Sequence, residues 1–306
     1  MGMSGMYGAD NDAQSIAVIQ AAIERGVTLL DTGDFYGTGH NELLIGKAIA
    51  GARRDKVQLS VKFGALRGPD GGWNGVDTRP AAIKNFLAYS LKRLGVDYVD
   101  IYRPARLDPA VPIEETIGTI AELVKQGYVR QIGLSEVGAD TVRRAHAVHP
   151  IADLQIEYSP ISRAPEDKIF PALHALGIGA TLYGVLSRGL LTGSKPQTND
   201  FRRFLPRFFG ENGEKNAAVA ARFGTLAVSW GMTPGQLAIA WVRAKEPRFT
   251  PLVGARTLAQ LADALGALDR TLSAGQVAEL ETQVNPDAIS GTRYPPQQMA
   301  HLDSEH

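Results

Sequence analysis

Short apolar runs alternate with helical patterns along most of the chain. The runs are rich in β-branched residues, and several end on one charged or polar side chain, which is typical of buried parallel strands. We expect such strands at residues 28–31, 57–62, 98–108, 129–136, 152–158, 179–183 and 249–253. Apolar residues spaced three or four apart predict helices at residues 12–25, 41–50, 80–94, 113–126, 139–148, 165–176, 214–230, 233–245 and 258–268.

This alternation indicates a parallel sheet, and its regularity favours closure into an α/β fold of the (β/α)8 TIM barrel type. No linker and no repeat longer than the strand–helix unit interrupts it, so residues 1–306 are expected to form a single domain. A capped helix at 273–284 precedes a proline-containing tail, residues 285–306, which we expect to lack regular structure. The polar and aromatic insertion at 195–216 is interpreted as a second lid or an interface.

Composition narrows the class of protein. The 306 residues are 44% hydrophobic, which suffices for one large core, and 32 basic residues balance 32 acidic ones. Neutral charge gives no indication of a nucleic-acid or membrane partner. The absence of cysteine excludes disulfides and zinc–thiolate sites. His146 and His149 have no third ligand nearby, so no metal is expected, and the lack of a signal pattern predicts a cytoplasmic protein.

Three side chains near the ends of two predicted strands carry the chemistry. Asp31 and Lys62 end these strands, and Tyr36 follows Asp31 in the loop. An ammonium stabilises a neighbouring phenolate and lowers the tyrosine pKa from about 10. A carboxylate keeps the lysine charged, so the tyrosine becomes a proton donor usable near neutral pH. Taken singly, Asp31 and Lys62 would more often be a structural ion pair, but the combined pattern favours catalysis.

The same stretches carry a family resemblance. Asp31-Thr32-x-x-x-Tyr36-Gly37, then Asn41-Glu42, then Val61-Lys62 resembles the aldo-keto reductases over nearly the whole chain. The resemblance implies that Asp31, Tyr36 and Lys62 are three members of a catalytic tetrad. It also implies NADPH-dependent reduction of an aldehyde or ketone. Members of this family usually begin with a further strand, so the first barrel strand is expected to be short or missing here.

No Rossmann G-x-G-x-x-G follows a predicted strand, and the resembled family binds an extended nicotinamide dinucleotide without that motif. The resemblance assigns Ser135 and Gln155 to the carboxamide and Tyr183 to stacking on the nicotinamide. The pyrophosphate loop would contribute Leu186, Arg188 and Leu190.

The adenosine end of the cofactor is assigned to the last barrel helix by the same resemblance. Helix N-terminal N–H groups favour an anion there, which fits the 2′-phosphate of NADPH. The residues implied are Gly254, Arg256 and Gln260, with Asp263 on the adenine amine. Arg256 favours NADPH over NADH, but many relatives place a further basic residue here, so we expect a modest preference. Glu136 stands where relatives commonly have asparagine.

The fourth residue of the family's tetrad, a histidine in a Leu-His-Arg-x-Asp-Pro setting, is replaced by Ala105. One interpretation is a nucleotide-binding regulatory subunit with little turnover. The other is a pocket enlarged for a bulkier carbonyl, with Tyr36 alone supplying the proton. Residues 105–109, 111–114, 133–137 and 157–159 resemble the pyridoxal reductase branch, which also lacks the histidine and favours the second interpretation.

Substrate contacts are the least readable part of the sequence. Pyridoxal is the first expected substrate, followed by other aromatic or polycyclic carbonyls, from resemblance alone. Arg103 shares strand parity with Ala105, so it points inward and is a candidate to replace the lost donor. Trp73 lies in the glycine-rich loop 65–77, which is either a mobile surface loop or an aromatic flap over the substrate. A monomer and a homo-oligomer both remain open.

Overall fold

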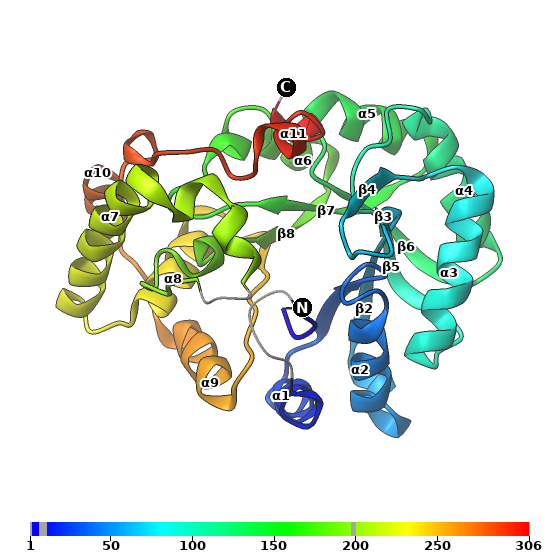
Figure 1. The fold of residues 1–306 in the computed structure, drawn as a ribbon, viewed down its shortest axis with the longest axis horizontal. Helices are drawn as coiled ribbons and strands as arrows, with labels where there is room; N and C mark the ends of the chain where they lie inside the picture. The colour runs from blue at the N-terminus through cyan, green and yellow to red at the C-terminus, as the bar shows by residue number, and fades with distance from the viewer. Residues whose placement is uncertain (1, 6–10, 197–199, 306) are drawn as a thin grey trace.

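One curled parallel sheet forms the centre of the molecule (Figure 1). The computed structural model describes residues 2–5, 11–196 and 200–305. The sheet has the order β1 (Leu29–Gly33), β2 (Gln58–Phe63), β5 (Val99–Pro104), β6 (Val129–Ser135), β7 (Ile151–Glu157), β8 (Gly179–Tyr183) and β9 (Thr250–Pro251). All neighbouring pairs are parallel, which confirms the predicted barrel architecture. In the described part of the chain no strand precedes β1, as expected.

Helices cover the outside of this sheet (Figure 1). They are α1 (Asp12–Glu24), α2 (His40–Ala48), α3 (Pro80–Leu94), α4 (Ile113–Lys125), α5 (Ala139–Val148), α6 (Ile169–Leu176), α8 (Pro234–Lys245) and α9 (Leu258–Gly266). Helix α7 (Gly210–Ser229) packs on α8 and on α10 (Ala274–Gln283). Helix α1 contacts both α2 and α9, so the ring of helices closes between the first and last strands. None of the described helices combines the length and apolar character needed to cross a bilayer.

Strand β2 shows how the sequence places the reactive groups. Leu59, Val61 and Phe63 are completely buried in the hydrophobic core between the sheet and the helices. Successive residues of a strand point to opposite faces, so Ser60 and Lys62 project to the other face, into the interior of the sheet. The apolar alternation therefore fixes which side chains meet inside the barrel.

The glycine-rich segment 65–77, predicted to be a mobile surface loop or an aromatic flap, contains a hairpin. Strands β3 (Ala65–Arg67) and β4 (Trp73–Val76) pair antiparallel. The turn is closed by hydrogen bonds from Gly68 N to Gly72 O (3.0 Å) and from Gly71 N to Gly68 O (2.9 Å). Gly71 has a φ of +76°, which a side chain would disfavour. The glycines thus build a turn between two short strands.

The insertion after β8 is also partly regular. Residues 197–199 of the predicted 195–216 segment lie outside the described part of the chain. The rest contains the 3₁₀ turns η4 (Phe201–Phe204) and η5 (Pro206–Phe208), and α7 begins at Gly210, before the predicted helix start at 214. Phe204 and Phe209 are exposed. A lid or interface role for this segment stays a prediction.

The expectation that residues 285–306 lack regular structure is wrong for the described residues. This tail forms η7 (Pro286–Ala288), α11 (Pro296–Met299) and η8 (Asp303–Glu305). Arg293 is buried and forms ion pairs with Glu136 (2.9 Å), Glu157 (3.2 Å) and Glu305 (2.5 Å). Leu302 is also buried. The tail is held by charges on β7 and just after β6, a long-range interaction that a local hydrophobic pattern does not reveal.

We predict that Arg293→Met undocks the tail and lowers the free energy of unfolding by about 3–5 kcal/mol, because Glu136 and Glu157 lose a shared buried cation. Urea unfolding measures the loss, and hydrogen exchange at residues 296–305 reports the undocking.

The matched control is Arg270→Met, which removes an exposed arginine elsewhere. It should leave both readouts unchanged. Full protection of the tail amides in the Arg293 variant would contradict the ion-pair account of docking.

Candidate active site

Asp31 is the centre of a hydrogen-bonded network inside the sheet. Its Oδ1 accepts a hydrogen bond from Lys62 Nζ. Its Oδ2 accepts from Ser60 Oγ at 2.8 Å and from Gln155 Nε2 at 2.7 Å. Burial raises the pKa of Asp31, but the charges of Lys62 and Arg103 more than offset this and lower it. Asp31 is therefore ionised and holds Lys62 in one position.

A second buried ion pair adjoins the first. Arg103 pairs with Asp153, and its guanidinium also donates to Ser60 Oγ at 3.0 Å. Ser60 thus connects Arg103 to Asp31. Two cations and two carboxylates are buried together, so their charges cancel, as the low-dielectric interior requires.

Tyr36 lies above this network at the end of β1. The backbone N–H of Tyr36 donates to Gly33 O at 3.1 Å, which closes the turn after the strand. The ring of Phe35 packs edge-on against the ring of Tyr36, with the two ring centroids 4.5 Å apart. Lys62 Nζ lies 5.2 Å from the centroid of the Tyr36 ring. The structure therefore brings together all three catalytic residues that the sequence predicts.

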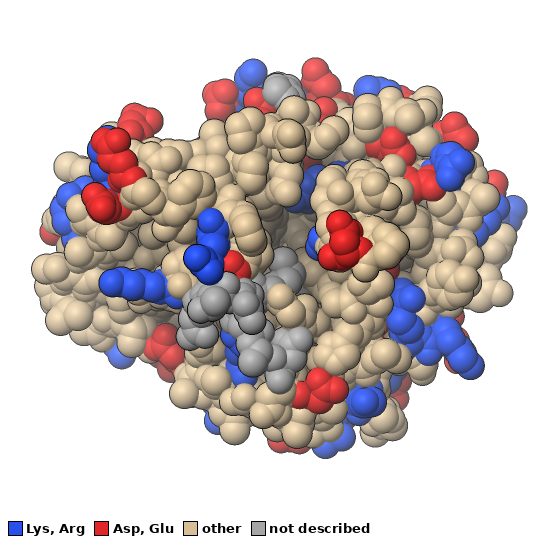
Figure 2. All heavy atoms as spheres, viewed as in Figure 1, with Lys and Arg blue, Asp and Glu red and all other residues tan. Residues whose placement is uncertain are grey.

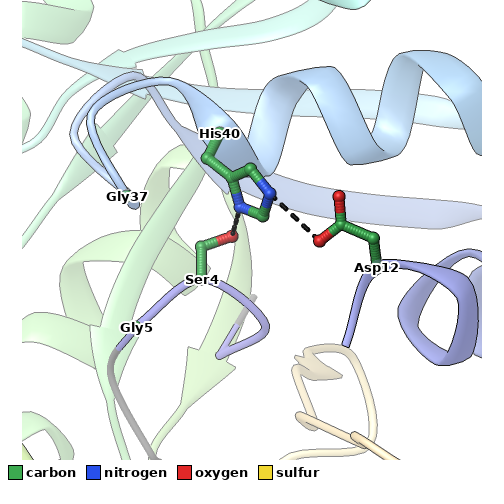
Figure 3. A pocket seen from close by; sticks show the side chains of 5 residues that line it. All are labelled: Ser4, Gly5, Asp12, Gly37 and His40. Carbon is green, nitrogen blue, oxygen red and sulfur yellow. Dashed lines mark hydrogen bonds and ion pairs between the residues drawn. The ribbon is translucent and has the colours of Figure 1, made fainter. Parts of the chain in front are cut away.

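The loop carrying Tyr36 is packed against the N-terminal segment. A cavity of about 230 Å³ is lined by Ser4, Gly5, Asp12, Gly37 and His40 (Figure 3). A Cβ on Gly37 would lie 2.8 Å from that of Ser4, and the φ of Gly37 is +57°, so glycine fits here for two reasons.

The same cavity places a serine, a histidine and an aspartate side by side. His40 Nδ1 lies 3.0 Å from Ser4 Oγ and Nε2 lies 3.1 Å from Asp12 Oδ1 (Figure 3). In a hydrolytic triad the aspartate contacts Nδ1 and the serine contacts Nε2, the reverse of this arrangement. Ser4 is also buried and accepts from Asn41 Nδ2 at 3.0 Å. The cluster ties the N-terminal segment to α2.

The residues predicted to hold the nicotinamide end lie on neighbouring strands. Ser135 and Gln155 are partners in the register of β6 and β7. Tyr183 ends β8, opposite Glu157. Its hydroxyl is 3.2 Å from that of Tyr294 in the tail, and burial raises its pKa well above 10.

The loop predicted to bind the pyrophosphate lies just after β8 in the chain. Leu186 packs partly buried against the core and Leu190 is buried. Arg188 has a φ of +57° and donates to Glu157 Oε2 and to Arg293 O, each at 2.9 Å. Its guanidinium carbon lies 4.3 Å from the centroid of the Tyr294 ring. The tail therefore lies against two residues assigned to the cofactor.

Of the predicted substrate residues, Arg103 is completely buried. It points inward, as its strand parity predicts, and is held by Asp153 and Ser60, while its Nε has no hydrogen-bond partner among the described residues. Its role as a donor in place of the missing histidine stays a prediction. Ala105 is buried at the end of β5, and its N–H donates to Phe63 O at 2.8 Å. Trp73 is partly exposed on β4 and lines a small cavity with Arg106 and Tyr294.

Comparison with known proteins places this geometry in a family. The sequence model described as "Aldo/keto reductase family" matches residues 1–285. The chain belongs to this family. The aldo-keto reductase fold is shared with a glycerol dehydrogenase from Gluconobacter oxydans, with a TM-score of 0.82, 27% identity, and coverage of 94% of this chain and 91% of that one.

Two further solved aldo-keto reductases are similar. The enzyme from Bacillus halodurans, in its holo form, has a TM-score of 0.76 and 25% identity over 94% of this chain and 92% of that one. The thermostable enzyme Tm1743, in complex with the inhibitor epalrestat, has a TM-score of 0.74 and 27% identity over 92% of this chain and 93% of that one. Membership implies an oxidoreductase, and the family generally uses NAD(P)H.

In this aldo-keto reductase the predicted adenosine site follows β9, which is joined to β8 by a hydrogen bond from Leu252 N to Leu182 O at 2.8 Å. Thr257 caps α9 by accepting from Gln260 N, and Gln260 Oε1 accepts from Arg256 N at 2.8 Å. The roles of Gly254, Arg256 and Gln260 toward a phosphate stay predictions.

Asp263, by contrast, accepts from Thr233 Oγ1 at 2.8 Å, so its carboxylate already links α9 to the start of α8. Among the described residues, no group of three histidines or carboxylates could hold a metal ion.

Sequence reasoning missed three residues at this end of the barrel. Glu136 was noted only because it replaces the family's usual asparagine. It is completely buried, and its carboxylate accepts hydrogen bonds from Arg293, Ser304 Oγ and Glu157 N. Burial raises its pKa, but Arg293 more than offsets this and lowers it to about 2. Arg106 could have been identified as a site residue from the sequence, because it directly follows Ala105. Tyr294 could not, because it lies in the tail, which was expected to lack regular structure.

Asp34, two residues before Tyr36, is a partly buried carboxyl whose pKa is raised. Its Oδ2 accepts from Gly64 N at 3.3 Å, and its Oδ1 has no hydrogen-bond partner among the described residues. Burial and the nearby Glu42 raise its pKa from 3.8 to about 7. The folded protein therefore holds a proton that the unfolded chain releases near pH 4.

We predict that Asp34→Asn flattens the pH dependence of stability. The stabilising effect of the retained proton is complete below about pH 4 and is lost as pH rises through about 7, so the intact protein should lose roughly 1–3 kcal/mol between pH 5 and pH 8 from this group. Urea unfolding at both pH values measures the difference.

The asparagine variant should lack this loss and should be the more stable protein at pH 8. The exposed Asp269→Asn serves as control and should keep the wild-type slope. Parallel slopes for the intact protein and the Asp34 variant would contradict the assignment.

Proposed function

We propose that the protein is an NADPH-dependent reductase that converts an aldehyde or ketone to the alcohol, with Tyr36 as the proton donor. One observation carries the proposal. Lys62, held by the ionised Asp31, places its ammonium beside the Tyr36 ring, 5.2 Å from the ring centroid.

The three residues divide the work of proton transfer. Tyr36 donates its phenolic proton to the carbonyl oxygen, and the Lys62 ammonium stabilises the phenolate that remains. Asp31 keeps Lys62 charged against the cost of burial, which by itself lowers the lysine pKa. The bound dinucleotide supplies the hydride. Positioned general acids contribute about 10²–10⁴-fold to rate.

The residues present suit a nicotinamide dinucleotide. Gln155 uses its amide N–H on Asp31, which leaves its carbonyl oxygen to accept from the carboxamide. Ser135 lies beside it, and Tyr183 offers a ring face at the end of the next strand. Arg256 and the start of α9 support NADPH over NADH, with a modest preference. Tyr294 touches Tyr183 and Arg188, so we expect the tail to shift or to pack on the cofactor.

Pyridoxal, or another aromatic or polycyclic carbonyl, is the proposed substrate. The resemblance to the pyridoxal reductase branch supports it, and Ala105 leaves the space that a histidine would fill. Trp73 and Tyr294 line the adjoining cavity with aromatic rings. We further propose a cytoplasmic protein whose partner is a small carbonyl compound rather than nucleic acid or membrane.

A regulatory subunit that binds the nucleotide with little turnover is the second candidate. Two observations favour it: the histidine position is Ala105, and the tail lies against Tyr183 and Arg188. It predicts tight NADPH binding without consumption.

We predict that Tyr36→Phe binds NADPH as the intact protein does but lowers kcat for carbonyl reduction by about 10²-fold or more. Steady-state and single-turnover NADPH oxidation, with pyridoxal and a panel of aromatic aldehydes, measures the effect. NADH in parallel reports the cofactor preference.

The control is Tyr128→Phe, which removes an exposed hydroxyl and should behave as wild type. Equal turnover by the Tyr36 variant would contradict the mechanism. Tight NADPH binding by the intact protein with no turnover of any carbonyl would favour the regulatory subunit.

A further inference from the structure

A small cavity opens between the hairpin, the end of β5 and the tail. It is lined by Trp73, Arg106, Tyr294, Gln298, His301 and Leu302. Its volume is about 40 Å³. Since a water-sized group needs about 10–15 Å³ by this measure, the cavity holds roughly three heavy atoms. The face viewed in Figure 2 is hollowed near its centre, with basic and acidic side chains interspersed around the hollow.

Arg106 is the charged group in this cavity, and it differs from the other arginines around the site. Arg103 pairs with Asp153, Arg188 with Glu157, and Arg293 with Glu136. Within the described ranges, no carboxylate lies within ion-pair distance of Arg106. Its protein acceptors are neutral: Ala105 O at 2.7 Å and Tyr294 Oη at 3.4 Å.

Burial of a cation is costly unless a partner compensates it. Arg106 is partly buried, and desolvation lowers its pKa, but Tyr294, Tyr183 and Glu136 together more than offset this and raise it, although none of them forms an ion pair with it. The nearby acid, Glu136, already binds Arg293 and Ser304. A guanidinium carries five N–H donors in a planar fork that matches a carboxylate. Arg106 therefore retains donors for an anion from outside the chain.

The cavity lies at the reacting end of the barrel. Arg106 directly follows Ala105, whose N–H bonds Phe63 O in the strand that carries Lys62. Strands β2 and β5 are adjacent, with Lys62 opposite Arg103 and Phe63 opposite Pro104. The charge of Arg106 also lowers the pKa of Lys62, which is consistent with this proximity. Tyr36 and Arg106 thus follow β1 and β5, the two strands that flank β2.

We propose that Arg106 binds an anionic group of the substrate, so that the protein prefers carbonyl compounds that carry a carboxylate. This inference rests on the proposed reductase function and adds its substrate class. The cavity size favours a carboxylate over a bulkier phosphate. Gln298 and His301 add polar groups at the rim, and Trp73 covers the apolar part of the substrate.

Matched substrates test the proposal. In the intact protein, kcat/KM for 4-carboxybenzaldehyde should exceed that for methyl 4-formylbenzoate by about 10- to 100-fold, the size of a charge-assisted hydrogen-bonded pair. Arg106→Gln should abolish this ratio, mainly by lowering kcat/KM for the carboxylate substrate, while Arg106→Lys should keep part of it. Arg79→Gln removes an exposed charge at the start of α3 and should keep the full ratio.

Pyridoxal and pyridoxal 5′-phosphate form the second pair. A gain for the phosphate ester that Arg106→Gln abolishes would support the anion site and assign it to phosphate. Equal kcat/KM values within both pairs in the intact protein, or ratios that Arg106→Gln leaves unchanged, would overturn the proposal.

Binding of benzoate against benzamide, measured by calorimetry with and without NADP⁺, separates this inference from the reductase function. Benzoate binding that Arg106→Gln abolishes would support the anion site even if no aldehyde is reduced. If neutral aldehydes are reduced but benzoate binds no more tightly than benzamide, the anion site is excluded and the reductase function is retained.

Discussion

The account depends on two ion pairs buried side by side in the barrel: Asp31 with Lys62, and Arg103 with Asp153. A single charge in this position would be neutralised or would destabilise the fold, because desolvation of a lone ion costs several kcal/mol. The two cations are matched by two carboxylates, and Ser60 joins the two pairs through its hydrogen bonds to Asp31 and Arg103. The core thereby holds a charged lysine at the barrel mouth, where Tyr36 can use it.

The sequence indicated half of this arrangement. Asp31 and Lys62 could be predicted, because each ends an apolar strand and their side chains then meet at one end of the sheet. The inward direction of Arg103 followed from strand parity. Its partner Asp153 could not be predicted, because it depends on how β5, β6 and β7 are placed across the barrel. From the sequence alone Arg103 was therefore a candidate substrate residue, and the structure adds its ion pair with Asp153.

The tail was missed for the same physical reason. Residues 285–305 have little apolar periodicity, so local pattern predicted no structure, yet Arg293 finds two buried glutamates on other elements. Glu136 thereby anchors the tail. The tail brings Tyr294 against Tyr183, Arg188 and Arg106. The ion pairs of Arg293 with Glu136 and Glu157 thus hold the tail against both the predicted cofactor side and the predicted substrate side of the mouth.

The pH dependence of kcat/KM for carbonyl reduction, compared between the intact protein and Lys62→Met, tests the central claim most directly. A lysine charge beside Tyr36 favours the phenolate, and reduction needs the protonated tyrosine. The account therefore predicts that the alkaline fall in activity moves to higher pH in the variant, on a lower plateau. An alkaline fall at the same pH in both proteins would contradict it.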